Sequence, residues 1–185
     1  MESRAGTLIG MQQTSRAMDR DAIEQAIREI HPDCFGWALT CCQHDREEAE
    51  DVLQASYLKA LEGRAVFHGS SSVKTWMFGI VRRTAWERRR SWLVRALIRR
   101  RPGEEIPPAP TPESIASDRE AHARLRGLLA QLSPRQRDLL HLVYYQEMTI
   151  EDASEVLGIT VGTARTHYAR GKDRLRALLQ GRNQA

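Results

Sequence analysis

Hydrophobic residues recur along this chain at the three- and four-residue spacing of amphipathic helices, and no stretch alternates as a half-buried strand does. In the first half this period predicts helices over about 19–30, 33–42 and 45–62, followed by a helix within 70–101. Pro32 prevents the first of them from continuing. The pattern therefore predicts an all-α protein.

The second half has the same period with sharper boundary signals. The sequence Ser-Pro-Arg-Gln at 133–136 combines an N-cap serine, a proline at the first helical position and a glutamine at the third, which is a capping box. A short helix from Thr149 ends at Gly158, and a longer one follows over Val161–Leu179. A short helix, a tight turn and a longer helix form a helix-turn-helix arrangement.

A proline-rich segment separates the two halves. Five of the seven prolines lie between Arg101 and Asp118, and such composition is typical of an extended linker. We therefore predict two small helical domains at 19–100 and 119–180, joined by a linker at 101–118. The N-terminal residues 1–18 lack a sustained period and are predicted to be a mobile tail.

Charge changes the interpretation of the fourth helix. The whole chain of 185 residues carries a net charge of only +4, yet nine arginines and a single acid lie between Arg82 and Arg101. Helical spacing buries one side of this helix and leaves arginines and Trp86 on another. Arginine neutralises phosphate and indole stacks on any base, so this surface suits nucleic acid. A solvated basic surface is the alternative interpretation.

The candidate nucleic-acid residues include two from the preceding loop, 63–72, whose aromatic and imidazole groups lie beside the arginines in sequence. The full set is Phe67, His68, Trp76, Arg82, Arg83, Trp86, Arg89 and Arg90.

Two further polar surfaces are candidates for binding. Glu47, Asp51 and Gln54 share one side of the helix predicted over 45–62. Ordinary solvation and a docking surface both explain them.

On the last helix, polar and basic side chains point away from the apolar side, as in a helix that reads the major groove. These are Thr163, Arg165, Thr166, Arg170 and Lys172. A plain helical hairpin with a basic outer face is the alternative.

Catalytic, metal and membrane functions find little support. Cys34, Cys41 and Cys42 are odd in number, so no disulfide framework is implied and a reducing cytoplasm fits best. Cys41, Cys42 and His44 lack a fourth ligand at a recognisable spacing, and we expect no metal or other cofactor. We also expect no enzyme active site, no transmembrane segment and no signal peptide.

Three segments together resemble the bacterial sigma-70 family, in its extracytoplasmic-function (ECF) group. EAEDVLQASYLKAL at 48–61 is similar to the polymerase-binding segment, and VKTWMFGIVRRTAWERRR at 73–90 to the segment that melts and reads the −10 element. Residues 132–179 are similar to the C-terminal domain that reads the −35 element. Arg83, Trp86 and Arg89 depart from the family's usual residues, which leaves the −10 base preference open.

The resemblance implies a transcription initiation factor without catalytic residues. Asp51 and Gln54, with Glu47 beside them, would meet the β′ clamp helices of core RNA polymerase, and the β flap is a second implied contact of the chain. The last helix would read the −35 major groove, while the arginine helix and the loop 63–72 hold the melted −10 region. An anti-sigma factor is a further implied partner. The alternatives are a free-standing helix-turn-helix regulator and an RNA-binding or adaptor protein.

Overall fold

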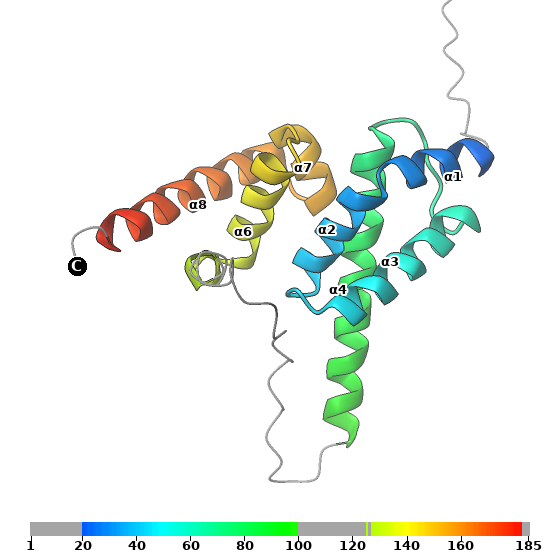
Figure 1. The fold of residues 1–185 in the computed structure, drawn as a ribbon, viewed down its shortest axis with the longest axis horizontal. Coiled ribbons are helices and arrows are strands. Elements are labelled where there is room, and N and C mark those ends of the chain that lie inside the picture. The colour runs from blue at the N-terminus through cyan, green and yellow to red at the C-terminus, as the bar shows by residue number, and fades with distance from the viewer. Residues whose placement is uncertain (1–19, 100–124, 126, 183–185) are drawn as a thin grey trace, which may run out of the picture.

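The computed structural model describes residues 20–99, 125 and 127–182, and within these ranges the chain is helical without any strand (Figure 1). The prediction of an all-α protein is therefore confirmed. The predicted tail 1–18 and the linker 101–118 lie outside the described residues.

The first half is a bundle of four helices whose ends lie close to the predicted ones. They are α1 (Arg20–Glu29), α2 (His31–Cys41), α3 (Arg46–Leu61) and α4 (Val73–Arg99). Local chemistry sets the starts of two of them. The carboxylate of Asp45 accepts the backbone N–H of Glu48 and caps α3, while the hydroxyl of Ser72 accepts the N–H of Thr75 in the first turn of α4.

Trp37 lies at the centre of this bundle. Its side chain is fully buried, its indole N–H donates to the backbone oxygen of Phe78 at 3.0 Å, and the two rings stack with centroids 5.9 Å apart. Met77 and Val81 are buried on the same helix. Because a buried indole needs a partner for its N–H, the hydrogen bond fixes how α2 lies on α4.

The second half contains the predicted helix-turn-helix. Its elements are α6 (Pro134–Leu140), the π-helix η1 (His141–Tyr145), α7 (Ile150–Leu157) and α8 (Val161–Arg182). The capping box of Ser133 and Gln136 is present in full. Gly158 ends α7 with a φ of 60°, in the left-handed region that glycine tolerates. The helices α8 and α6 approach each other closely at Gly171, since a Cβ there would lie 3.1 Å from the side chain of Gln136.

The π-helix is a feature that periodicity does not predict. Helical spacing from Leu140 predicts that Tyr144 lies on the buried side of a continuous α-helix, but Tyr144 is 60% exposed. A π-turn contains more residues than an α-turn and rotates the following side chains around the axis. His141, the first residue of η1, faces the first half.

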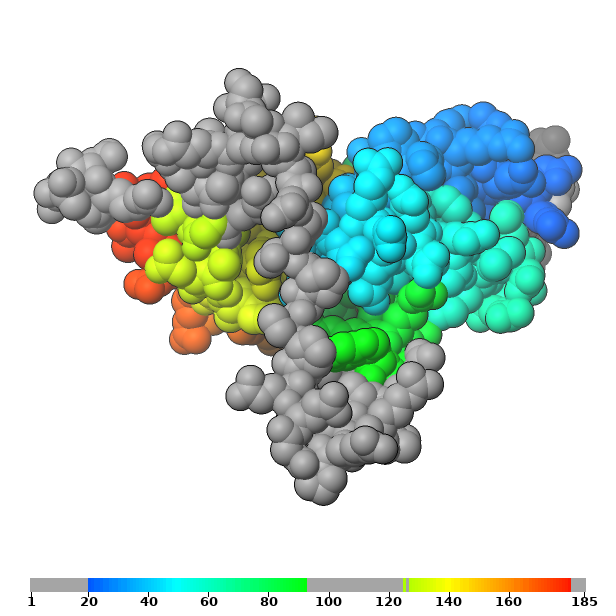
Figure 2. All heavy atoms as spheres, turned by 60° about the horizontal axis from the view of Figure 1, so that its bottom comes forward, coloured from blue at the N-terminus to red at the C-terminus, as the bar shows by residue number. Residues whose placement is uncertain are grey.

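The two halves pack against each other. Residues of α2 and α4 form one continuous hydrophobic core with residues of α6, η1 and α7, and the space-filling view shows both halves side by side (Figure 2). We call this contact the junction. The rings of Trp37 and His141 meet there with centroids 5.4 Å apart.

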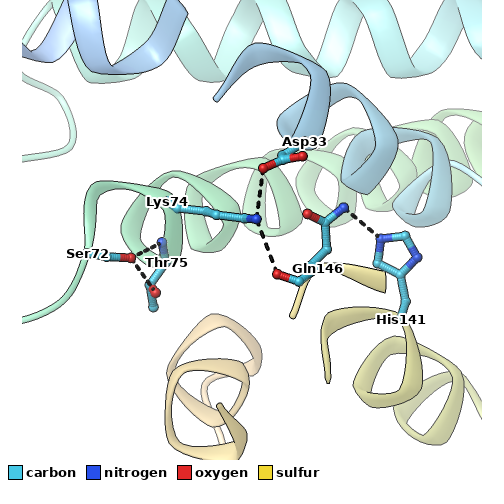
Figure 3. Close-up of polar contacts among 6 residues, drawn as sticks. All are labelled: Asp33, Ser72, Lys74, Thr75, His141 and Gln146. Carbon is cyan, nitrogen blue, oxygen red and sulfur yellow. Dashed lines mark hydrogen bonds and ion pairs between the residues drawn. The ribbon is translucent and has the colours of Figure 1, made fainter. Parts of the chain in front are cut away.

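A chain of hydrogen bonds crosses the junction through His141. Thr40 donates its hydroxyl proton to the oxygen of Gly36 at 3.1 Å, so its oxygen is free to accept Nδ1–H of His141 at 3.2 Å. Nε2 of His141 then accepts from the amide nitrogen of Gln146 at 3.4 Å (Figure 3). We assign this tautomer from the network, and it requires a neutral imidazole.

The neutral state of His141 makes stability depend on pH. Burial, with smaller contributions from His44 and Lys74, lowers the pKa of His141 to about 4, against about 6.5 in an unfolded chain. Below pH 6.5 the unfolded state therefore binds a proton that the folded state excludes, so stability falls as the pH falls toward 4.

We predict that His141 lowers the free energy of unfolding by about 2 kcal/mol when the pH falls from 7 to 5. Urea titrations of the parent and of His141→Asn at both pH values measure it. The Asn variant should lose that part of the pH dependence. An equal change in the free energy of unfolding between pH 7 and pH 5 in the two proteins would contradict the neutral state of His141.

Candidate nucleic-acid and polymerase surfaces

The middle of α4 exposes an aromatic ring among cations. Trp86 is 59% exposed, and the guanidinium of Arg90 lies over its ring at 5.5 Å from the centroid. Arg83 and Arg89 are also exposed. We call these four residues the α4 surface. A flat ring flanked by arginines can stack a base and neutralise the adjoining phosphates.

A second aromatic site lies at the start of the same helix. The rings of Phe67 and Trp76 have centroids 5.2 Å apart, which joins the loop before α4 to its first turn. His68 is exposed next to Phe67. Ten residues separate Trp76 from Trp86, or about 15 Å along the helix. A single strand of a few nucleotides is therefore long enough to contact both sites.

Arg82 differs from the other arginines of the predicted set. Its side chain is only 27% exposed and its Nε lies 3.8 Å from a carboxylate oxygen of Asp138 on α6. Burial lowers the pKa of Arg82 and raises the pKa of Asp138, although each charge favours the ionised form of the other. The sequence pattern expected Arg82 on the solvent side of α4, and the structure instead places it in the junction.

The start of α8 presents a row of polar side chains. Thr160 accepts the backbone N–H of Thr163 at 3.2 Å and so caps the helix. Thr163, Arg165 and Thr166 are exposed beyond that cap, and Arg165 reaches Glu151 of α7 at 2.8 Å. An exposed ion pair of this kind stabilises little, so the guanidinium can exchange Glu151 for another acceptor.

The rest of the predicted set on α8 divides in two. Arg170 is exposed. Lys172 is half-buried, with its ammonium 5.5 Å from the centroid of the Tyr168 ring. It therefore contacts that ring and does not lie on the outer surface of α8 with Arg170.

The polar side of α3 carries an apolar residue that sequence analysis missed. Glu47, Asp51 and Gln54 are exposed as expected. Leu58, four residues after Gln54, lies on the same side and is 50% exposed. We call these four residues the α3 surface. Asp51 also pairs with Arg88 of α4, which links this surface to the arginine helix; the helical spacing of Leu58 was the available signal.

The cysteines have no reactive setting. Burial raises the pKa of the Cys34 and Cys42 thiols to about 12 and also raises that of Cys41, so all three stay protonated at neutral pH. In the part of the chain that the structure describes, no group of three histidine, cysteine or acidic side chains is arranged to hold a metal ion. Nor is any described helix long and apolar enough to span a membrane.

Comparison with known families identifies both halves. Residues 26–100 match sigma-70 region 2, and residues 122–175 match sigma-70 region 4. The chain belongs to the sigma-70 family of RNA polymerase sigma factors. Its relatives place it in the ECF group. It is 30% identical over 130 residues to the ECF RNA polymerase sigma factor SigL of Mycobacterium tuberculosis, covering 68% of this chain and 72% of SigL.

Other sigma factors match a larger share of the chain. RNA polymerase sigma factor YlaC of Bacillus subtilis is 29% identical over 155 residues, which is 83% of this chain and 89% of YlaC. Among solved structures, RpoE of Bartonella quintana in complex with the anti-sigma factor NepR has a TM-score of 0.65 at 24% identity, covering 88% of this chain and 98% of RpoE. CnrH in complex with the cytosolic domain of CnrY has a TM-score of 0.61 at 20% identity, covering 88% and 90%.

This sigma factor therefore contains both conserved regions in the expected order. Region 2 includes the α3 and α4 surfaces, and region 4 includes the helix-turn-helix. A free-standing helix-turn-helix regulator is not favoured, because region 2 would have no place in it.

The α4 surface leads to a prediction on single-stranded DNA. Trp86→Ala should weaken binding of a labelled single-stranded oligonucleotide by about 1–3 kcal/mol, because one base loses its stacking partner. Trp86→Tyr should keep most of the affinity. Trp92, 46% exposed six residues along the same helix, provides the control. Fluorescence anisotropy measures all three variants, and an equal loss in Trp92→Ala would contradict a specific stacking role for Trp86.

Proposed function

We propose that this sigma factor binds core RNA polymerase through the α3 surface, the −35 element through α8, and the melted −10 region through the α4 surface and the loop 63–72. The polymerase supplies the chemistry, and the chain contributes no catalytic residue. The proposal rests chiefly on one observation: a single chain combines region 2, with its exposed arginines and Trp86, and a helix-turn-helix of region 4.

The proposed polymerase contact has the composition of a docking site. The α3 surface combines carboxylates, an amide and the exposed Leu58 along one side of one rigid helix. Exposed apolar residues rimmed by polar ones are typical of protein interfaces. The charge of this side suits basic groups, as on the β′ clamp helices that the family resemblance implies.

DNA opening at −10 requires that unstacked bases be stabilised. Unstacking costs a few kcal/mol per base, while stacking on an exposed aromatic ring returns about 1–3 kcal/mol. The exposed Trp86 offers one such site, and the half-buried pair of Phe67 and Trp76 offers a second one at the start of α4. Arg83, Arg89 and Arg90 supply phosphate contacts, which strengthen the binding of either strand without regard to sequence.

Sequence recognition at −35 is assigned to the first turns of α8. Thr163, Arg165 and Thr166 are exposed there, and a recognition helix contacts base edges through its N-terminal residues. The hydroxyl proton of Thr166 already bonds the oxygen of Gly162 at 3.0 Å, so Thr166 offers an acceptor, whereas Arg165 offers donors.

Two further parts of the proposal concern regulation and location. RpoE of Bartonella quintana, whose fold is similar to that of this chain, was solved in complex with the anti-sigma factor NepR, which supports an anti-sigma factor as a partner of this chain. A factor that works with RNA polymerase acts where the polymerase is, in the cytoplasm.

Run-off transcription tests the function directly. Core polymerase and a promoter that is induced when this protein is overexpressed should give a specific transcript only when this protein is added. Transcription that needs another sigma factor to be present would instead indicate a regulator, and would overturn the proposal.

Leu58→Ala should weaken the binding of core polymerase by at least 1 kcal/mol, because a half-exposed leucine is buried in the proposed interface. Asp51→Ala combined with Gln54→Ala should weaken it further. Competition against a second sigma factor for a limited amount of core measures both. Leu179 is 49% exposed at the other end of the molecule, so Leu179→Ala is the matched control, and an equal effect there would exclude a local role for the α3 surface.

A further inference from the structure

The guanidinium of Arg165 on α8 is held by a residue of α7. Its Nη2 donates to Oε1 of Glu151 at 2.8 Å, across the turn that joins the two helices (Figure 1). The side chains of Arg165 and Glu151 are 66% and 58% exposed. In a helix-turn-helix complex the first helix crosses the DNA backbone while the second one contacts base edges. The ion pair therefore joins the two elements that would meet DNA.

Both residues are attached to a well-fixed backbone. Thr149 accepts the backbone N–H of Asp152 at 3.0 Å and caps α7, and Glu151 lies within that first turn. Ala164, which precedes Arg165, is fully buried in the core and holds the start of α8 in place. The direction of the Arg165 side chain is therefore set by its contact with Glu151.

This contact leaves most of the guanidinium free to bind. A guanidinium has five N–H donors in one plane, and Glu151 accepts from one nitrogen only. The second N–H of Nη2 and a neighbouring nitrogen still form a two-donor edge. Such an edge matches the adjacent O6 and N7 acceptors of guanine in the major groove, whereas adenine has a donor in place of one of them. Arg165 can therefore contact guanine without leaving Glu151.

The carboxylate also changes which DNA group Arg165 would choose. A freely moving arginine can bind a phosphate as well as a base, and phosphate contacts carry no sequence information. Glu151 repels phosphate through its own negative charge, so the ion pair disfavours the backbone and favours a base edge. A side chain that is already held in its binding orientation also loses less entropy when it binds.

We propose that Glu151 is a specificity-determining residue at the −35 element, because it positions Arg165 to read a guanine and disfavours a phosphate contact by the same side chain. This inference rests on the proposed function, since it takes α8 as the helix that reads −35. Glu151 contacts no base and is a positioning residue. Its place in the first turn of α7 also interacts favourably with the helix dipole, so thermal stability alone does not test the role.

The test measures base preference in the holoenzyme. Core polymerase carrying each variant is titrated with promoter duplexes in which one −35 base pair at a time is replaced. The parent should prefer guanine at one position by about fivefold or more, and Arg165→Ala should lose that preference. Glu151→Ala should reduce the same preference by about threefold or more, yet bind the replaced promoters at least as well as the parent, because a charge that repels phosphate is gone.

Two further variants separate positioning from charge and from helix stability. Glu155→Ala removes an exposed acid one turn further along α7 and should leave the preference unchanged. Glu151→Gln keeps an acceptor oxygen without the charge and should retain part of the preference. Adding Glu151→Ala to Arg165→Ala should raise the affinity for all promoters evenly, by about twofold, because the carboxylate no longer faces DNA without its partner.

Equal preferences in Glu151→Ala and Glu155→Ala would overturn the role of Glu151. So would an Arg165→Ala variant that weakens binding to all promoters evenly, since Arg165 would then contact phosphate. In both cases a −35 preference of the parent leaves the proposed function intact. A parent holoenzyme without a preference at any −35 base pair would instead refute the assignment of α8 to the −35 element, and this inference with it.

Discussion

The structure depends on the way that one helix is shared. One side of α4 forms the core of the first half, where Trp37 bonds the backbone of Phe78 and Met77 is buried. Another side meets the second half at Lys74, Thr75 and Arg82. Only the remaining side, with Trp86, is open to solvent. A helix has room for three such contacts only if each side chain is committed to one of them, and Arg82 is committed to the second half, where it faces Asp138.

Those features of the fold that arise from local chemistry could be predicted from the sequence. The capping box at Ser133, the glycine that ends α7 at Gly158 and the exposed row at the start of α8 follow from interactions among residues a few positions apart. The family could also be recognised, because its three segments keep their order. The exposure of Trp86 followed from helical spacing in the same way.

The junction could not be predicted, because it depends on contacts between residues far apart in the sequence. Periodicity gives α4 one buried side, whereas packing against α7 buries a second one and the contact with Asp138 of α6 half-buries Arg82. The π-turn at His141 could not be predicted either, since it is a small change in the winding of a helix whose residue types do not require it. Leu58 was missed for a different reason: its spacing from Gln54 indicates the polar side of α3, but a search for charged and amide side chains does not select an apolar residue.

That the open side of α4 holds the separated −10 strand is the central claim, and the permanganate reactivity of the −10 thymines in the complex with core polymerase and promoter DNA tests it most directly. The account predicts strong reactivity with the parent protein and a clear loss of reactivity with Trp86→Ala, because Trp86 is the exposed ring on that side. Equal reactivity with the two proteins would contradict it.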